Sequence, residues 1–148
     1  MKPDVDRFIE VAAMYLIAQL PPALGSKYDQ SNVTTLGALL AVLREEFDRA
    51  SARRVDENRA LRRLFAEAAP VVQDTALRTQ LEDAAAGEDA SLLVSALERG
   101  NASLRALLID LHAHVEQLTT PDAKRIEDAI WTELVTSTER RRLMMAPF

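Results

Sequence analysis

Leucines spaced alternately three and four residues apart dominate two long stretches of this chain. The first stretch extends from Leu36 to Ala68, and the second from Leu93 to Leu118. Such spacing places apolar side chains along one side of a helix, and helices of this kind pack against each other by that side. The pattern therefore predicts an all-α fold, an antiparallel bundle of about five helices with two long central helices.

One local motif occurs once in each of these stretches. Residues 58–64 read Asn-Arg-Ala-Leu-Arg-Arg-Leu and residues 101–107 read Asn-Ala-Ser-Leu-Arg-Ala-Leu, so both follow N-x-x-L-R-x-L. In one interpretation the leucines are core residues, and the arginines lie beside them and pair with acids. In the other interpretation, two asparagines and two arginines converge to bind an anion: Asn58, Arg62, Asn101 and Arg105. The sequence favours the first interpretation.

Start and stop signals divide the chain into five expected helices within one domain, residues 1–148. Asp4 and Thr120 are suited to cap the first and the last helix. The expected helices cover residues 4–20, 31 or 32 to 70, 70–86, 89–118, and 120 to the arginines at 140–142.

Two positions decide whether the long helices are continuous. Arg54 and Glu57 interrupt the apolar side of the second helix, which either breaks near residues 51–56 or changes its packing partners there. Gly100 stays in phase with the leucines of the fourth helix, and we expect that helix to continue through it. A second helix that outruns its own partners leaves apolar surface, which favours a homodimer. The tail Met144–Phe148 is expected to contribute to such contacts.

Composition excludes several classes of function. The net charge of -5 provides no basic surface for nucleic acid. The chain has no cysteine, which excludes disulfides and thiolate metal sites. No uncharged stretch approaches the roughly 20 apolar residues of a membrane span. Acidic residues near the N-terminus are unlike a signal peptide, so we expect no membrane contact and a cytoplasmic location.

His112 and His114 are the two histidines of the chain. They lie two residues apart, so on a helix they point in different directions and cannot share a metal. The helical pairs are Asp110 with His114 and His112 with Glu116. The Glu-x-x-His motif of di-iron bundles is absent. We therefore expect no metal and no other cofactor, with the histidines at the edge of the core.

The first part of the chain combines a short helix, a leucine-proline stop and a long helix that carries Leu-Arg-Glu-Glu. The residues are Arg7-Phe8 to Leu20-Pro21, Leu39 to Glu46, and Glu57-Asn58 to Leu61-Arg62. In these features the chain resembles a family of small, uncharacterised bacterial helical proteins. Members of that family tend to be encoded near acyl-CoA dehydrogenases and small-molecule-kinase-like proteins. The resemblance implies an accessory role in acyl-CoA metabolism and assigns no functional residues.

These features favour a non-enzymatic accessory or protein-interaction module that forms a homodimer or binds another protein. No catalytic residue is assigned. The alternative is a binder of small anionic molecules or a small enzyme, with a site near the histidines between two helices. The candidate ligand-binding residues are Arg62, Arg105, Asp110, His112 and His114.

Overall fold

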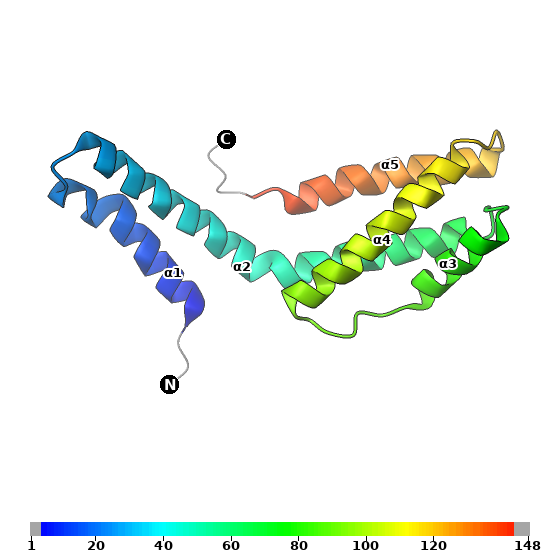
Figure 1. The fold of residues 1–148 in the computed structure, drawn as a ribbon, viewed down its shortest axis with the longest axis horizontal. Coiled ribbons are helices and arrows are strands. Elements are labelled where there is room, and N and C mark those ends of the chain that lie inside the picture. The colour runs from blue at the N-terminus through cyan, green and yellow to red at the C-terminus, as the bar shows by residue number, and fades with distance from the viewer. Residues whose placement is uncertain (1–3, 144–148) are drawn as a thin grey trace. The chain divides into compact units, whose positions relative to one another are not determined.

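The computed structural model describes residues 4–143, which contain helices and short helical turns but no strand. The helices are α1 (Val5–Met14), α2 (Lys27–Ala68), α3 (Thr75–Ala86), α4 (Val94–Val115) and α5 (Pro121–Arg141) (Figure 1). The predicted all-α fold with two long helices is confirmed. The predicted tail contacts of residues 144–148 lie outside the described residues. In the described part of the chain, no helix combines the length and the apolar character needed to cross a membrane.

The chain divides into two compact units, with the boundary between Ala50 and Ser51 inside α2. We call residues 4–50 the N-terminal hairpin and residues 51–142 the C-terminal unit. α2 remains helical through residues 51–57. Of the two alternatives for this stretch, a break in the helix is therefore absent.

The N-terminal hairpin consists of α1 and the first part of α2, which run antiparallel (Figure 1). Asp4 caps α1 as predicted, because its side chain accepts a hydrogen bond from the Arg7 amide at 3.2 Å. A π-helical stretch, Tyr15–Gln19, and a 3-10 turn, Pro21–Ala23, follow α1. The predicted start of α2 at residue 31 or 32 is wrong by about one turn. Ser26 precedes the helix, and its hydroxyl accepts from the Asp29 amide at 3.4 Å.

The two helices of the hairpin approach closely at Gly37. A Cβ atom at this position would lie 2.6 Å from the Ile17 Cγ1 atom and 2.9 Å from the Ala13 carbonyl oxygen. Only glycine leaves room for that contact. Nearer the start of α1, Arg44 donates two hydrogen bonds to the Asp6 carboxylate, at 2.7 and 2.9 Å.

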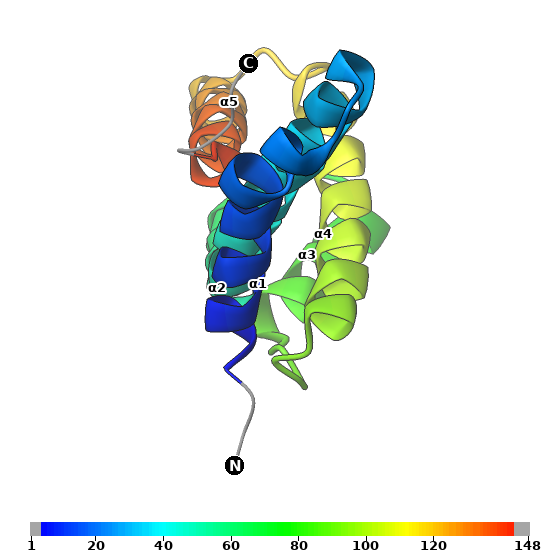
Figure 2. The ribbon, with the colours of Figure 1, turned by 90° about the vertical axis from the view of Figure 1, so that its left-hand side faces the viewer.

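The C-terminal unit holds the apolar core, to which the second part of α2 and the helices α3, α4 and α5 contribute. α3 packs against α4 and α4 packs against α5 (Figures 1 and 2). Of the four leucines of the repeated motif, which were predicted to be core residues, Leu107 is partly buried and the other three are buried. The fully buried core includes Leu61, Leu64, Phe65, Val72, Leu81, Leu104, Leu108, Leu111, Val115, Ile126 and Ile130.

Two further predicted helix starts are wrong, and both errors come from acidic residues with other roles. α3 begins at Thr75 and not at residue 70, because the Asp74 side chain accepts from the Leu77 amide at 2.9 Å and caps the helix there. α4 begins at Val94 and not at residue 89, because Asp89 lies in the preceding loop and binds Arg62.

The last two helices follow the remaining predictions more closely. α4 continues through Gly100, as expected. Its buried side is turned relative to the predicted one and consists of Leu97, Asn101, Leu104, Leu108, Leu111 and Val115. α5 begins at Pro121 as predicted, and the Thr120 side chain caps it by accepting from the Ala123 amide at 3.2 Å.

Candidate functional site

Large apolar side chains of the N-terminal hairpin lie in solvent. Phe8 is 72% exposed, Phe47 57% and Leu43 56%. We call the following exposed residues the hairpin face: Val5, Phe8, Val11, Tyr15, Leu36, Leu39, Leu43 and Phe47. Monomeric proteins rarely expose a contiguous apolar patch of more than a few hundred Å². The three aromatic side chains alone leave roughly 300–400 Å² exposed, at about 200 Å² for a whole side chain.

The residues of the hairpin face lie on one side of the hairpin. Ala13 of α1 and Gly37 of α2 mark the sides by which the two helices contact each other. At about 100° per residue, the exposed stripe on each helix lies roughly a third of a turn from that contact. Because the helices run antiparallel, both rotations lead to the same side of the pair. Met14, which is 55% exposed, lies on the opposite side.

Charged residues border the hairpin face. Asp6 and Glu10 lie within 4 Å of Arg44 and form ion pairs with it beside the contact between the helices. The hydrogen bond from Arg44 lowers the pKa of Asp6 below its usual value, more than burial raises it. The hairpin therefore presents apolar side chains with ion pairs at their border, as protein-interaction surfaces do.

The two asparagines of the repeated motif meet inside the C-terminal unit. The Asn101 side-chain amide donates to the Asn58 side-chain oxygen at 2.9 Å, and both residues are buried. Asn58 in turn donates to the Asp89 carboxylate at 2.9 Å and to the Leu97 carbonyl at 3.4 Å. The motif thus joins α2 to α4 by a polar contact beside its core leucines.

Glu57 is buried next to the two asparagines and forms a bidentate ion pair with Arg141 of α5. The Arg141 guanidinium donates to both carboxylate oxygens, at 2.8 and 2.7 Å. Burial raises the pKa of Glu57, but hydrogen bonds from Arg141 and the charges of Arg141, Arg53 and Arg105 outweigh burial, so the pKa lies below its ordinary value. The polar interruption predicted at Glu57 is therefore a buried, ionised contact that ties α2 to α5.

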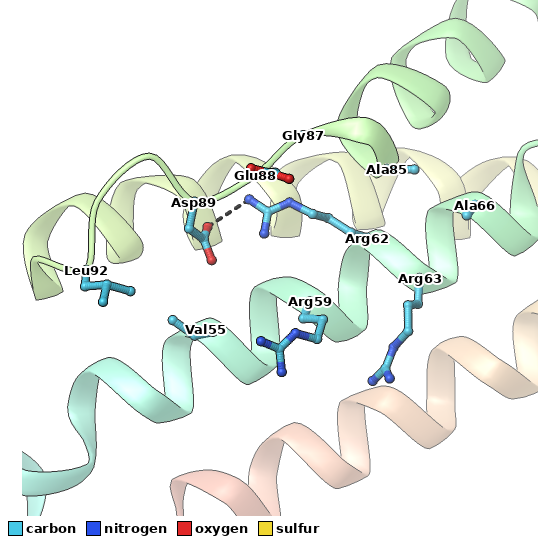
Figure 3. A pocket seen from close by; sticks show the side chains of 10 residues that line it. All are labelled: Val55, Arg59, Arg62, Arg63, Ala66, Ala85, Gly87, Glu88, Asp89 and Leu92. Carbon is cyan, nitrogen blue, oxygen red and sulfur yellow. Dashed lines mark hydrogen bonds and ion pairs between the residues drawn. The ribbon is translucent and has the colours of Figure 1, made fainter.

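A second ion pair lies at the edge of a pocket of about 550 Å³. Arg62 of α2 donates to the carboxylate of Asp89, which lies in the loop that precedes α4, at 2.8 Å (Figure 3). This hydrogen bond lowers the pKa of Asp89 below its ordinary value, against the opposing effect of burial. Within the described residues, the buried Arg62 Nε atom has no hydrogen-bond partner.

Cationic side chains outnumber anionic ones around this pocket. Arg59 and Arg63, both exposed, point away from the Arg62–Asp89 pair (Figure 3). The pocket is lined by Val55, Arg59, Arg62, Arg63, Ala66, Ala85, Gly87, Glu88, Asp89 and Leu92. Such a surface can attract an anion whose other end is apolar.

The other predicted site residues do not assemble into one site with Arg62. Arg105 lies near Glu57, where its charge lowers the pKa of that acid, and does not line the pocket. Asp110 is exposed. His114 accepts a hydrogen bond from the Gln73 amide at 3.3 Å through its Nε2 atom. The helical spacing suggested a pair of His114 with Asp110. In the structure the His114 ring receives the Gln73 backbone amide.

His112 and Glu116 lie close together, as their four-residue spacing predicted. Its Nε2 atom is 3.4 Å from the Glu116 carboxylate, and its ring packs edge-on against Trp131 at 5.3 Å between centroids. Glu127 of α5 brings a third possible ligand atom to the same place. Sequence reasoning missed Glu127 because it comes from a different helix, and Asp89 because it lies in a loop.

The hairpin face is separate from the other two features, whereas the buried polar network and the arginine-lined pocket share Asp89, whose carboxylate accepts from both Asn58 and Arg62. No catalytic pair of nucleophile and base is formed by the residues predicted from the sequence. No family model, curated protein or solved structure matches this chain.

Proposed function

We propose that the protein is a non-enzymatic, cytoplasmic interaction module that pairs with a second copy of itself through the hairpin face. The observation that carries this proposal is the exposure of eight large apolar side chains on one side of the N-terminal hairpin. Burying apolar surface of this kind is the dominant driving force of protein association.

The hairpin face of a second copy of the chain is the binding partner that fits this surface best. Two antiparallel helices with apolar residues along one side form half of a four-helix bundle. A two-fold axis through the face would bring the same residues together from both copies, which is how most homodimers associate. The eight side chains of the hairpin face are themselves uncharged, so their own contacts would bring no like charges together. The flanking pairs of Arg44 with Asp6 and Glu10 stay at the rim.

The test is the mass of the protein in solution, measured by light scattering at micromolar concentration. The wild-type chain is expected at twice its 16.4 kDa. Leu43→Glu places a charge at the centre of the face and should give the mass of one chain. Met14→Glu is the matched control, because Met14 is as exposed as Leu43 but lies on the opposite side.

Two results would overturn the proposal. One is a wild-type chain that is monomeric at tens of micromolar. The other is a dimer that survives both Leu43→Glu and Phe8→Glu, since the interface would then lie elsewhere. Helical content, measured by circular dichroism, should be unchanged in each variant, because the substituted side chains are exposed.

Binding of an anionic small molecule is the second candidate function, and one observation favours it. Among the described residues, the buried Arg62 Nε–H group has no acceptor, and it lies beside a pocket that carries two further arginines. An acceptor oxygen supplied by a ligand would satisfy this donor, which otherwise carries a desolvation cost.

Coenzyme A is a suitable probe for this candidate, since the family resemblance implies acyl-CoA metabolism and the molecule joins phosphates to an apolar arm. We expect coenzyme A to bind in a calorimetric titration, with weaker binding after Arg63→Ala. Arg99→Ala is the control, because Arg99 is exposed on α4 and does not line the pocket. Equal binding by both variants, or no binding by the wild type, would argue against an anion site.

A further inference from the structure

The structure brings together three metal-ligating side chains where α4 ends and α5 passes beside it. They are His112 on α4, Glu116 one helical turn later at the C-terminal cap of that helix, and Glu127 on α5. Each offers one ligand atom, and these atoms all lie within 4.8 Å of one another. A divalent ion held by these groups would link the two helices.

We propose that His112, Glu116 and Glu127 form a binding site for a divalent cation of the zinc type. Nitrogen and oxygen ligands around zinc lie at about 2.0–2.2 Å, which puts two ligands of a tetrahedral site about 3.4 Å apart. The Nε2 atom of His112 and the Oε1 atom of Glu116 are 3.4 Å apart. This part of the site already has the spacing that zinc requires, and the ligand atom of Glu127 lies within 4.8 Å of the other two.

The state of the imidazole nitrogen is the second observation that points to a ligand. The Nε2 atom of His112 is buried and makes no hydrogen bond within the described residues, and the Glu116 carboxylate at 3.4 Å forms an ion pair with it only when the ring is protonated. In the neutral ring this nitrogen has no hydrogen-bond partner, and a bound cation would satisfy it. The contact with Trp131 orients the ring, as neighbours of a ligating histidine commonly do.

The chemistry of the donor set selects the ion. An imidazole with two carboxylates suits zinc and related transition ions, whereas magnesium and calcium prefer all-oxygen sites. Lys124 is the competing cation, because its amine lies 3.0 Å from the Glu127 carboxylate. That lysine side chain is 64% exposed, so it can leave the carboxylate at little structural cost when the ion arrives.

This inference also explains why the sequence predicted no metal. Two histidines that diverge on one helix cannot share an ion, and the pair of His112 with Glu116 supplies only two ligands. The third ligand follows from the packing of α5 on α4. The site is independent of the hairpin face, so the two proposals can fail separately.

Trp131 allows a site-specific test, because it is the single tryptophan of the chain and contacts His112. Zinc chloride is titrated into tag-free protein, and tryptophan fluorescence is recorded in parallel with calorimetry. We expect one ion per chain, a change in fluorescence that saturates at the same ratio, and no comparable response to magnesium or calcium.

Three variants locate the ion. Glu127→Gln and His112→Ala should each weaken zinc binding at least about tenfold, since each removes a ligand. His114→Ala is the matched control and should bind as the wild type does, because His114 lies two residues away and faces the Gln73 amide. Circular dichroism should show that all three variants keep the helical fold.

The proposal is overturned by any of three results. The first is the absence of stoichiometric zinc binding by the wild-type protein. The second is binding that persists in both Glu127→Gln and His112→Ala, which would place the ion elsewhere. The third is an equal loss in His114→Ala and His112→Ala, which would indicate general histidine binding at the surface.

Discussion

Glu57 shows how one buried charge can join helices that are far apart in the sequence. Its carboxylate is almost fully buried, binds Arg141 of α5, and lies 3.4 Å from the Asn101 amide of α4. Removing one partner of such a contact leaves the other without its counter-charge. The stability of the C-terminal unit should therefore depend on the ionisation of this residue.

Glu57→Gln is expected to lower the free energy of unfolding by about 1–3 kcal/mol at pH 7, the value of a hydrogen bond to a charged group. The folded pKa of Glu57 is lowered, so its stabilisation is complete above the unfolded pKa of about 4.3 and is lost as the pH falls through the folded pKa. The difference between wild type and Glu57→Gln should therefore shrink below about pH 4.

Urea unfolding at pH 7 and at successively lower pH measures this difference. Glu82→Gln on α3 is the control, because Glu82 is exposed, and it should leave stability nearly unchanged. A gap between wild type and Glu57→Gln that stays constant from pH 7 to pH 3 would contradict an ionised Glu57. Asp89, whose pKa is also lowered, destabilises both proteins alike in acid.

The candidate site was predictable at the residue scale only where its members share a helix. The pair of His112 with Glu116 follows from the four-residue spacing, and the structure contains it. The asparagines of the motif converge as one interpretation required, and Arg62 joins Asn58 at the Asp89 carboxylate. Arg105, in contrast, lies near Glu57 and does not line the pocket. Asp89 and Glu127 could not be found, because loop conformation and helix packing decide their positions, and neither has a periodic signal in the sequence.

At the scale of elements, two helical glycines have different surroundings, so replacing each by alanine should change stability in opposite directions. A Cβ at Gly37 would collide with Ile17 and with the Ala13 carbonyl oxygen, whereas a Cβ at Gly100 would meet its nearest neighbours at 3.7 Å and 3.9 Å. Glycine within a helix costs about 0.5–1 kcal/mol relative to alanine. The expected outcome therefore depends on space alone.

Gly100→Ala should raise stability by up to about 1 kcal/mol, because alanine fits there and favours the helix. Gly37→Ala should lower stability by about 1–3 kcal/mol, since the hairpin helices must move apart. Thermal unfolding of both variants checks the pair. Stabilisation by both substitutions would show that the hairpin helices do not contact each other at Gly37.

Helix identity was easier to predict than helix boundaries, for a physical reason. Leucine periodicity runs over many turns, so it marked α2 and α4 and the continuity of α4 through Gly100. A boundary depends on a single capping side chain. Asp4 and Thr120 were recognised as caps, but Ser26 and Asp74 compete with similar residues nearby, and the structure places the ends of α2 and α3 at those two.

At the scale of the whole molecule, the core of the C-terminal unit should dominate stability. Leu111 is fully buried in it, whereas Ile109 on the same helix is 69% exposed. Leu111→Ala should cost about 2–5 kcal/mol in the free energy of unfolding. Ile109→Ala, the matched control, should change it by less than about 0.5 kcal/mol. Similar effects in chemical denaturation would contradict the observed orientation of α4.

The leucine pattern identifies apolar sides but not what covers them. One continuous spacing runs along α2, yet Leu36, Leu43 and Phe47 are exposed, whereas Leu61 and Leu64 belong to the core. Nothing in the spacing distinguishes these two parts, because the difference lies in which other helices reach them. Coverage is a property of the assembled chain, and the sequence of one helix does not record it.

The distance in sequence between Glu57 and Arg141 has a consequence for synthesis on the ribosome. Eighty-four residues separate the two partners, so Glu57 leaves the exit tunnel long before its arginine is made. The hairpin, in contrast, is complete once residue 50 has emerged. Chains are synthesised at about 5–20 residues per second, which leaves several seconds between the two events. During that interval the proposed pairing would have time to form between neighbouring nascent chains on one messenger RNA, before the core closes.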